Sequence, residues 1–308
     1  MSIALKDAAL DTNRPFTVAA GLAAGLTRST LRGPLFRRIL HGVYIAARVP
    51  VRARERIEAA LLVHPDGAWA SHASAARVYR LPVPARCTDE HVTVRRRQDR
   101  RARREVVPHL AAELSRACLV AGLPVSRPLD LFLELAGLLN LVELVVVGDA
   151  MVRLGLVSRQ ELVDAMAVSH DPHARAARRA ATYVRAEVDS PMESRLRMLL
   201  VLAGLPEPRV NFKLLYDDGR VRYRLDLSYP ELQLAVEYDG RHHRDDDKQH
   251  ENDVDRDEWL DYHGWMLTKV FSRGIQDFDG TAGVKAMEDR LQVVGGLADT
   301  ERLLMDQG

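Results

Sequence analysis

The chain has 308 residues, of which 47% are hydrophobic and 28% are charged, and its formal net charge is +1. This length and composition are typical of a soluble protein with buried cores and room for two domains. Two cysteines, Cys87 and Cys118, exclude a disulfide framework and a cysteine-rich zinc site. Because we find neither an apolar run of ~20 residues nor a signal peptide, we expect a cytoplasmic protein without a membrane partner.

Residues 1–50 have the pattern of a winged helix-turn-helix unit. Apolar residues at helical spacing predict a helix over 16–24, and Gly25 supplies a turn. Thr27 is a suitable N-cap for a second helix that runs to Arg32. Residues 36–45 are then expected to form a β-ribbon, the wing of the unit.

The winged helix of AbiEi-type antitoxins is similar to residues 25–45, GLTRSTLRGPLFRRILHGVYI. In that family the module is thought to bind DNA. The resemblance implies that four arginines of this unit contact nucleic acid: Arg28, Arg32, Arg37 and Arg38. The alternative is a helical packing module that does not touch DNA.

Residues 51–170 are predicted to be mainly helical and resemble the middle region that follows the winged helix in AbiEi-type proteins. We expect helices over 52–64, 71–79, 129–139, 142–154 and 159–167, and a strand over 91–94. An arginine-rich block at 95–104 is either a solvated loop or a contact to a phosphate backbone. Four histidines lack metal-ligand spacing and are interpreted as structural or surface residues: His64, His72, His91 and His109. Residues 171–187 are expected to form a connecting helix.

The sequence Ser190-Pro191-Met192-Glu193 predicts the start of another helix. Serine is a good N-cap, proline suits the first helical position, and Glu193 at the third position completes a capping box. The plain interpretation of Glu193 is therefore that it caps its own helix.

Three strands are predicted next, over 210–216, 222–229 and 232–239. If Pro230 and Glu231 form a two-residue hairpin loop, Asp226 pairs with Ala235 and lies diagonal to Glu237, about 7–8 Å away. Glu237 and Asp239 share that side of the sheet. Clustered carboxylates repel one another unless a cation lies between them, and hard carboxylate oxygens suit Mg²⁺ or Mn²⁺.

The residues after these strands include further groups with chemical roles. His243 can act as a general acid or base, or contact a phosphate. Asp253 and Arg256 are three residues apart and therefore share a helix face. A final strand is predicted over 265–271.

The combination of Glu193, Asp226, VEYDGRHH at 236–243 and HGWMLTKV at 263–270 resembles the Vsr-like domain of the PD-(D/E)xK nuclease superfamily. The resemblance implies a restriction-endonuclease-like α/β/α domain with a mixed sheet over 188–295, followed by a tail over 296–308. The whole chain would then be an α+β protein with a mainly helical N-terminal region.

By this resemblance Asp226 and Glu237 are metal ligands and Glu193 is an auxiliary acid. Two further residues would belong to the catalytic set: Asp239 and His243. Nucleic-acid contacts in this domain would come from Arg241, His242, Arg256 and Lys269. The lysine of the superfamily motif is Asp239 here, which leaves the general base open.

Three functional hypotheses follow. The first is a DNA endonuclease that uses Mg²⁺ or Mn²⁺, acting in repair or defence. The second is a non-catalytic DNA-binding transcriptional regulator of the type IV antitoxin kind. The third is a protein that binds a toxin or defence-system partner. A homodimer is compatible with all three hypotheses.

Overall fold

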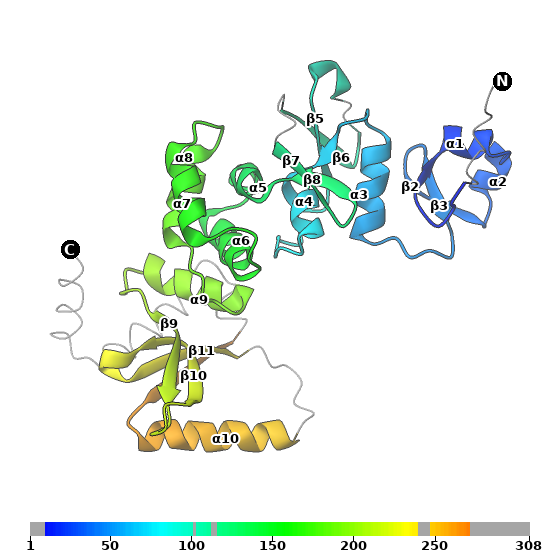
Figure 1. The fold of residues 1–308 in the computed structure, drawn as a ribbon. Helices are drawn as coiled ribbons and strands as arrows, with labels where there is room; N and C mark the ends of the chain where they lie inside the picture. Colours follow the sequence, from blue (N-terminus) through cyan, green and yellow to red (C-terminus); the bar gives the residue numbers. More distant parts are fainter. Residues whose placement is uncertain (1–9, 101–102, 112–115, 240–246, 272–308) are drawn as a thin grey trace. The chain divides into compact units, whose positions relative to one another are not determined.

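The computed structural model in Figure 1 describes residues 10–100, 103–111, 116–239 and 247–271. The chain divides into two compact units. One comprises residues 1–140 and 164–178, and the other comprises residues 141–163 and 179–308. The described elements form an α+β protein with three sheets, which confirms the predicted fold class at this level.

The first unit begins with a small winged-helix arrangement. Its elements are β1 (Phe16–Thr17), α1 (Val18–Ala23), α2 (Arg28–Arg32), β2 (Phe36–Leu40) and β3 (Val43–Ala46), and the sheet order is β1-β3-β2. The Thr27 side chain accepts a hydrogen bond of 3.0 Å from the backbone N–H of Thr30, as expected for an N-cap. The first helix starts two residues later than predicted because β1 pairs with β3.

The five helices and the strand over 91–94 predicted for residues 51–170 are present, but this stretch also contains further strands that complete a five-stranded sheet, which the sequence analysis did not predict. Its strands, in the order β6-β5-β4-β8-β7, are both parallel and antiparallel. They are β4 (Trp69–Ala70), β5 (Glu90–Val94), β6 (Val106–Leu110), β7 (Ala117–Val120) and β8 (Leu123–Ser126). The helices of this part of the unit are α3 (Ala53–Leu62), α4 (His72–Val78) and α5 (Pro128–Leu135).

Three helices follow α5: α6 (Leu141–Arg153), α7 (Arg159–Val168) and α8 (Ala174–Tyr183). The most apolar of them, α6, is buried along most of its length. Over the described ranges, none of the helices has both the length and the apolar character needed to cross a bilayer.

The second unit contains a four-stranded mixed sheet in the order β12-β11-β10-β9. Its elements are α9 (Pro191–Leu202), β9 (Arg209–Leu215), β10 (Val221–Tyr229), β11 (Leu234–Asp239), α10 (Asp247–Tyr262) and β12 (Met266–Phe271). The strands β9, β10 and β11 are antiparallel neighbours, whereas β12 returns through α10 and lies parallel to β11. The four predicted strands of this unit are present, each within two residues of its expected bounds.

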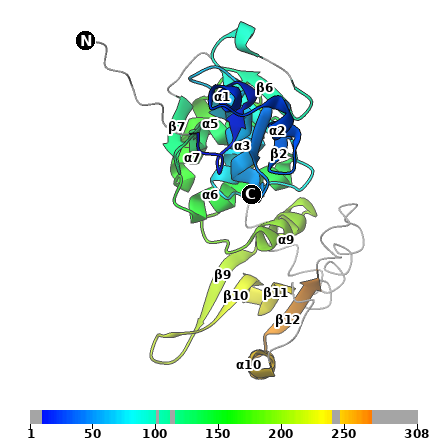
Figure 2. The ribbon, with the colours of Figure 1, turned by 90° about the vertical axis from the view of Figure 1, so that its right-hand side faces the viewer.

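One helix covers each face of this sheet. Figures 1 and 2 show α9 on one side and α10 on the other. Leu196 and Leu200 of α9 pack against Val236, whereas Leu260 of α10 packs against Ala235. Since neighbouring residues of a strand point to opposite faces, these two clusters define the two faces of the sheet.

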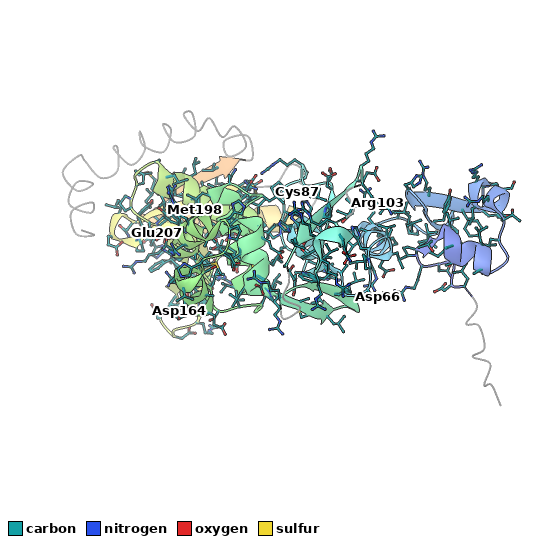
Figure 3. The ribbon with its side chains drawn as sticks, turned by 90° about the horizontal axis from the view of Figure 1, so that it is seen from above. Asp66, Cys87, Arg103, Asp164, Met198 and Glu207 are labelled. Carbon is teal, nitrogen blue, oxygen red and sulfur yellow. The ribbon has the colours of Figure 1, made fainter. Side chains whose placement is uncertain are left out.

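A buried network of charged side chains joins α9 to α6 in the same unit. The Arg197 guanidinium is fully buried and donates to Asp149 Oδ2 at 3.0 Å and to Glu207 Oε1 at 2.8 Å. Glu207, which Figure 3 labels, also pairs with Arg185. Asp149 in turn accepts hydrogen bonds from Ser194 Oγ and from the backbone N–H of Arg185, at 2.8 and 2.7 Å. The network holds α9, which carries Glu193, against α6.

Candidate active site

The connection between β10 and β11 is longer than the predicted two-residue hairpin loop. The short 3₁₀ helix Pro230–Leu232 and the left-handed residue Gln233 form it, and Tyr229 pairs with Leu234. The register therefore differs by two residues from the prediction. A shift of two preserves which side chains share a face, so the error did not separate Asp226 from Glu237. The ladder itself ends at Leu227–Val236, one residue short of both acids, and their proximity is indicated by the effect of the Glu237 charge on Asp226.

Asp226 lies where the pairing of β10 with β11 stops. Its carboxylate accepts a hydrogen bond from the backbone N–H of Tyr238, in place of the next rung of the ladder. Leu225 and Leu227 on either side of it belong to the cores on opposite faces of the sheet. The strict alternation predicted for β10 is therefore broken at Asp226, which lies at the end of the paired region.

Asp226 lies in an acidic environment. Burial, followed by repulsion from Glu193 and Glu237, raises the pKa of its carboxyl from 3.8 to about 7, despite the opposing charge of Arg256. The carboxyl group of Asp226 on β10 thus responds to the charges of Glu193 on α9 and Glu237 on β11. The ligand atoms of these three acids do not all lie within 4.8 Å of one another, so a shared ion would be held mainly by two of them.

Glu193 has the capping role that the sequence predicted, with one difference. The Ser190 hydroxyl accepts from the backbone N–H of Glu193 at 3.2 Å. The Glu193 carboxylate accepts from the N–H of Asp189, at 3.0 Å, rather than from that of the N-cap residue Ser190. Glu193 is 7% exposed and faces Asp226 closely enough to raise the pKa of that group. The two interpretations of Glu193 are therefore compatible.

Arg256 of α10 is the cation nearest to these acids among the described residues. Its guanidinium binds Glu237 with two hydrogen bonds, one of which, from Nη1 to Oε2, is 2.8 Å long. Lys269 is the register neighbour of Glu237 on β12 and pairs with Asp257. Arg256 and Lys269, predicted as nucleic-acid contacts, are thus engaged with acids of their own unit.

Four residues of the predicted catalytic and binding set cannot be placed. Asp239 ends β11, but its side chain lies outside the described residues. Arg241, His242 and His243 also lie outside them. Their proposed roles remain predictions from the sequence.

The raised pKa of Asp226 leads to a prediction about stability. An acid whose pKa is higher in the folded than in the unfolded state destabilises the fold as the pH rises from 3.8 to about 7. We therefore expect Asp226→Asn to be more stable than the wild type at pH 8 in EDTA, and similar to it at pH 4. Urea unfolding measures this difference, and Asp261→Asn, an exposed acid of α10, is the control. If Asp226→Asn is less stable than the wild type at pH 8, repulsion from Glu193 and Glu237 does not destabilise the fold at Asp226.

The four arginines predicted for the winged helix are all exposed. Arg28 and Arg32 are four residues apart on α2 and therefore share one face of the helix. Arg37 and Arg38 are neighbours on β2, so their side chains point to opposite faces of the strand. Arg37 also donates to the backbone carbonyl of Ala47.

A group of residues in the first unit was missed by the sequence analysis. His72, His91 and His109, interpreted as scattered structural residues, have ligand nitrogens that all lie within 4.8 Å of one another. Burial lowers the pKa of His72 to about 2 and that of His109 to about 4, and it also lowers the pKa of His91. Spacings of 18 and 19 residues gave no signal of a ligand set, because the sheet that gathers them was not predicted.

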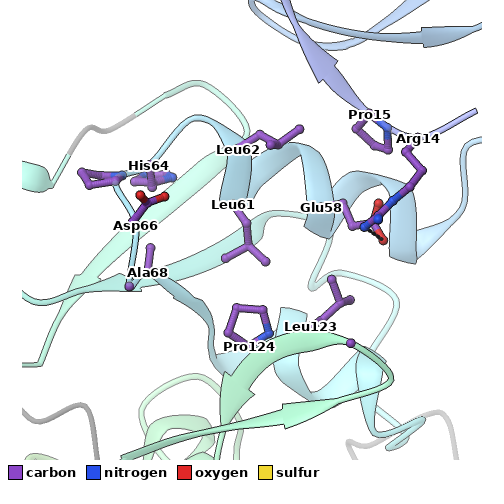
Figure 4. A pocket seen from close by; sticks show the side chains of 13 residues that line it. Arg14, Pro15, Glu58, Leu61, Leu62, His64, Asp66, Ala68, Leu123 and Pro124 are labelled. Carbon is purple, nitrogen blue, oxygen red and sulfur yellow. Dashed lines mark ion pairs between the residues drawn. The ribbon is translucent and has the colours of Figure 1, made fainter. Parts of the chain in front are cut away.

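The first unit has a cavity of about 560 Å³ between α3 and β8 (Figure 4). Apolar side chains such as Leu61 and Leu123 line it. At its edge the exposed Arg14 pairs with Glu58 at 3.5 Å. This cavity brings together no comparable set of metal-binding groups.

Comparison with known proteins gave no assignment for either group of residues. Neither models of known protein families nor curated proteins matched the chain. Function is therefore inferred from the side chains themselves.

Proposed function

We propose that the second unit is a metal-dependent nuclease that hydrolyses phosphodiester bonds in DNA. The observation that carries this proposal is the convergence of Glu193, Asp226 and Glu237 at the end of the β10–β11 ladder. Each comes from a different element, and at least two of them are largely buried. Buried like charges destabilise a fold, and a divalent cation removes that cost.

The donor set fits a hard cation such as Mg²⁺ or Mn²⁺. Carboxylate oxygens are the preferred ligands of these ions, and each oxygen has two lone pairs. Glu237 can therefore accept from Arg256 and still offer a lone pair to a metal. Asp226 and Glu237 would hold the ion, and Glu193 would contribute negative charge beside it.

The bound ion would supply an activated water and stabilise the charge that develops on the phosphate. The protein side chains have more limited tasks. Asp226 and Glu237 fix the position of the site at the end of two strands. Arg256 and Lys269 provide positive charge on the α10 face, where they can offset the charge of a bound phosphate. The winged helix would add exposed arginines for the DNA backbone.

The direct test is cleavage of supercoiled plasmid by the full chain. We expect nicked or linear product with Mg²⁺ or Mn²⁺ and none with EDTA. A Glu237→Gln protein purified in parallel controls for contaminating nuclease. If neither metal supports cleavage but the protein shifts duplex DNA in a gel, the proposal fails and the regulator hypothesis is supported.

The same proteins provide a prediction about salt. Binding through arginine–phosphate contacts releases counterions, so the logarithm of the affinity falls linearly with the logarithm of salt concentration, with a slope of roughly −0.9 per phosphate contact. We expect a clear negative slope in a gel-shift titration, and a smaller one for Arg28→Ala/Arg32→Ala. A slope that does not change in this variant would remove α2 from the interface.

A further inference from the structure

The five-stranded sheet of the first unit brings three histidines together from separate elements. His72 begins α4, immediately after β4, and His91 and His109 lie on the parallel strands β5 and β6. In the sheet, β5 lies beside β4, and β6 is the edge strand on the other side of β5. We call these residues the histidine cluster.

The cluster is compact: its three rings are stacked nearly parallel, with interplanar angles of 17–19°, and its ligand nitrogens lie within 4.8 Å of one another. His91 Nδ1 lies 2.9 Å from His109 Nε2, and the rings of His72 and His109 are stacked with centroids 3.6 Å apart. Tetrahedral zinc with Zn–N bonds of about 2.0–2.1 Å places its ligand nitrogens about 3.3 Å apart. The nitrogens are therefore close enough for one ion, which would replace the hydrogen bond between His91 and His109 and would require the stacked rings to turn until their lone pairs converge.

The cluster borders a cavity of about 500 Å³ in the same unit. Thr93 also lines this cavity, and it is 2% exposed. Its hydroxyl Oγ1 has no hydrogen-bond partner among the described residues. Since buried polar atoms normally have a partner, this hydroxyl independently indicates that a ligand or water belongs in the cavity.

A second layer of hydrogen bonds orients the cluster. The Glu134 carboxylate accepts from the backbone N–H of His72 at 2.9 Å and from the Ser126 hydroxyl at 2.8 Å. His72 Nδ1 lies 3.1 Å from the Ser71 hydroxyl and 3.8 Å from Glu134, which leaves Nε2 available as a ligand. Metal-binding histidines typically use their second nitrogen in this way, through a carboxylate or another polar partner.

The backbone around the cavity is strained at two histidines. His72 and His173, both of which line the cavity, have φ angles of +47° and +67°. Such conformations are unfavourable for residues other than glycine and are often found at functional sites. In addition, a Cβ atom on Gly137 would lie 2.7 Å from the His173 ring, so a larger residue here would require that ring to shift. The surrounding structure is thus shaped to keep the histidine side chains at the cavity.

We propose that His72, His91 and His109 bind one transition-metal ion of the Zn²⁺ class, with a remaining coordination position toward the cavity. Imidazole suits Zn²⁺ and related borderline ions better than Mg²⁺ or Ca²⁺. Three protein ligands with one exchangeable position form the donor set of catalytic rather than structural zinc sites. This centre is separate from the carboxylate site of the second unit and does not depend on the nuclease proposal.

The test is titration of the metal-free full chain with Co²⁺, a spectroscopic substitute for Zn²⁺, in excess Mg²⁺ that occupies carboxylate sites. We expect one Co²⁺ per chain with a strong visible band, displaced by Zn²⁺. His109→Gln should lose this band and weaken binding at least 100-fold, since even loss of an outer-layer partner costs about 10- to 100-fold. His41→Gln, which replaces an exposed histidine outside the cluster, should bind as the wild type does.

The far-UV circular dichroism of each variant shows whether it is folded. A folded His109→Gln protein that keeps the band overturns the assignment. If that variant does not fold, X-ray absorption at the zinc edge of the wild type decides instead. A shell with about three imidazoles supports the centre, and a shell of oxygen ligands alone overturns it.

Discussion

Replacement of Asp226 by alanine is expected to lower metal-dependent cleavage of DNA by about 10³-fold or more. A metal ion contributes several kcal/mol to stabilisation of the transition state, and each ~1.4 kcal/mol corresponds to a factor of ten in rate. Asp226 is the acid whose pKa responds to both Glu193 and Glu237, so its removal breaks up the donor set. The assay is nicking of supercoiled plasmid at saturating Mg²⁺.

The control for this variant is Asp218→Ala in the turn between β9 and β10. Asp218 is exposed and is hydrogen-bonded to Arg220 in the same turn, so cleavage should not change. Asp226→Ala also removes repulsion and is expected to remain folded. Cleavage that is unaffected in a folded Asp226→Ala protein would move the catalytic site away from β10.

Replacement of Asp149 by alanine is expected to destabilise the second unit by about 3–5 kcal/mol, which is the usual cost of an uncompensated buried charge. Asp149 and Arg197 are 1% and 0% exposed. Burial raises the pKa of Asp149, although Arg197 and hydrogen bonds from Arg185 and Ser194 oppose the change. Without Asp149, the charge of Arg197 would keep only Glu207 and the Tyr183 carbonyl as partners.

Urea unfolding at neutral pH measures this loss. The double variant Asp149→Ala/Arg197→Met should recover part of it, because it also removes the buried guanidinium that has lost one of its two carboxylate partners. Asp261→Ala, at an exposed position of α10, should be close to the wild type. If Asp149→Ala costs less than about 1 kcal/mol, the network does not hold α9 in place. The position of Glu193 would then depend on packing alone.

Much of the second unit could be predicted because its signals are local. Ser190 and Pro191 marked the start of α9, and the strands had enough alternating residues to be located. The connection after Tyr229 is two residues longer than predicted, because Leu232 and the left-handed Gln233 belong to it and β11 begins only at Leu234. This left-handed residue is not a glycine, so no local residue pattern predicted its conformation.

The first unit was harder to predict for physical reasons. β4 has only two residues, and β6 contains Pro108, which is tolerated because β6 is an edge strand of its sheet. Neither segment shows a long alternating pattern. The histidine cluster depends on the parallel register of β5 and β6 and on the position of α4 after β4. Such long-range pairing cannot be predicted from the spacing of the histidines in the sequence.

The four-residue connection Pro230–Gln233 also bears on how this part of the chain tolerates changes in length. Side chains alternate with a period of two in the paired part of β10 and β11, so removal of two residues would keep the same side chains on each face of this paired part. Deletion of a single residue would instead move the side chains of β11 to the opposite face of the sheet relative to those of β10, so Val236 would no longer face α9. Natural or engineered variation in this connection should therefore be limited to even steps, whereas the turn at Asp217–Gly219 is free of that restriction as far as Asp226 and Glu237 are concerned.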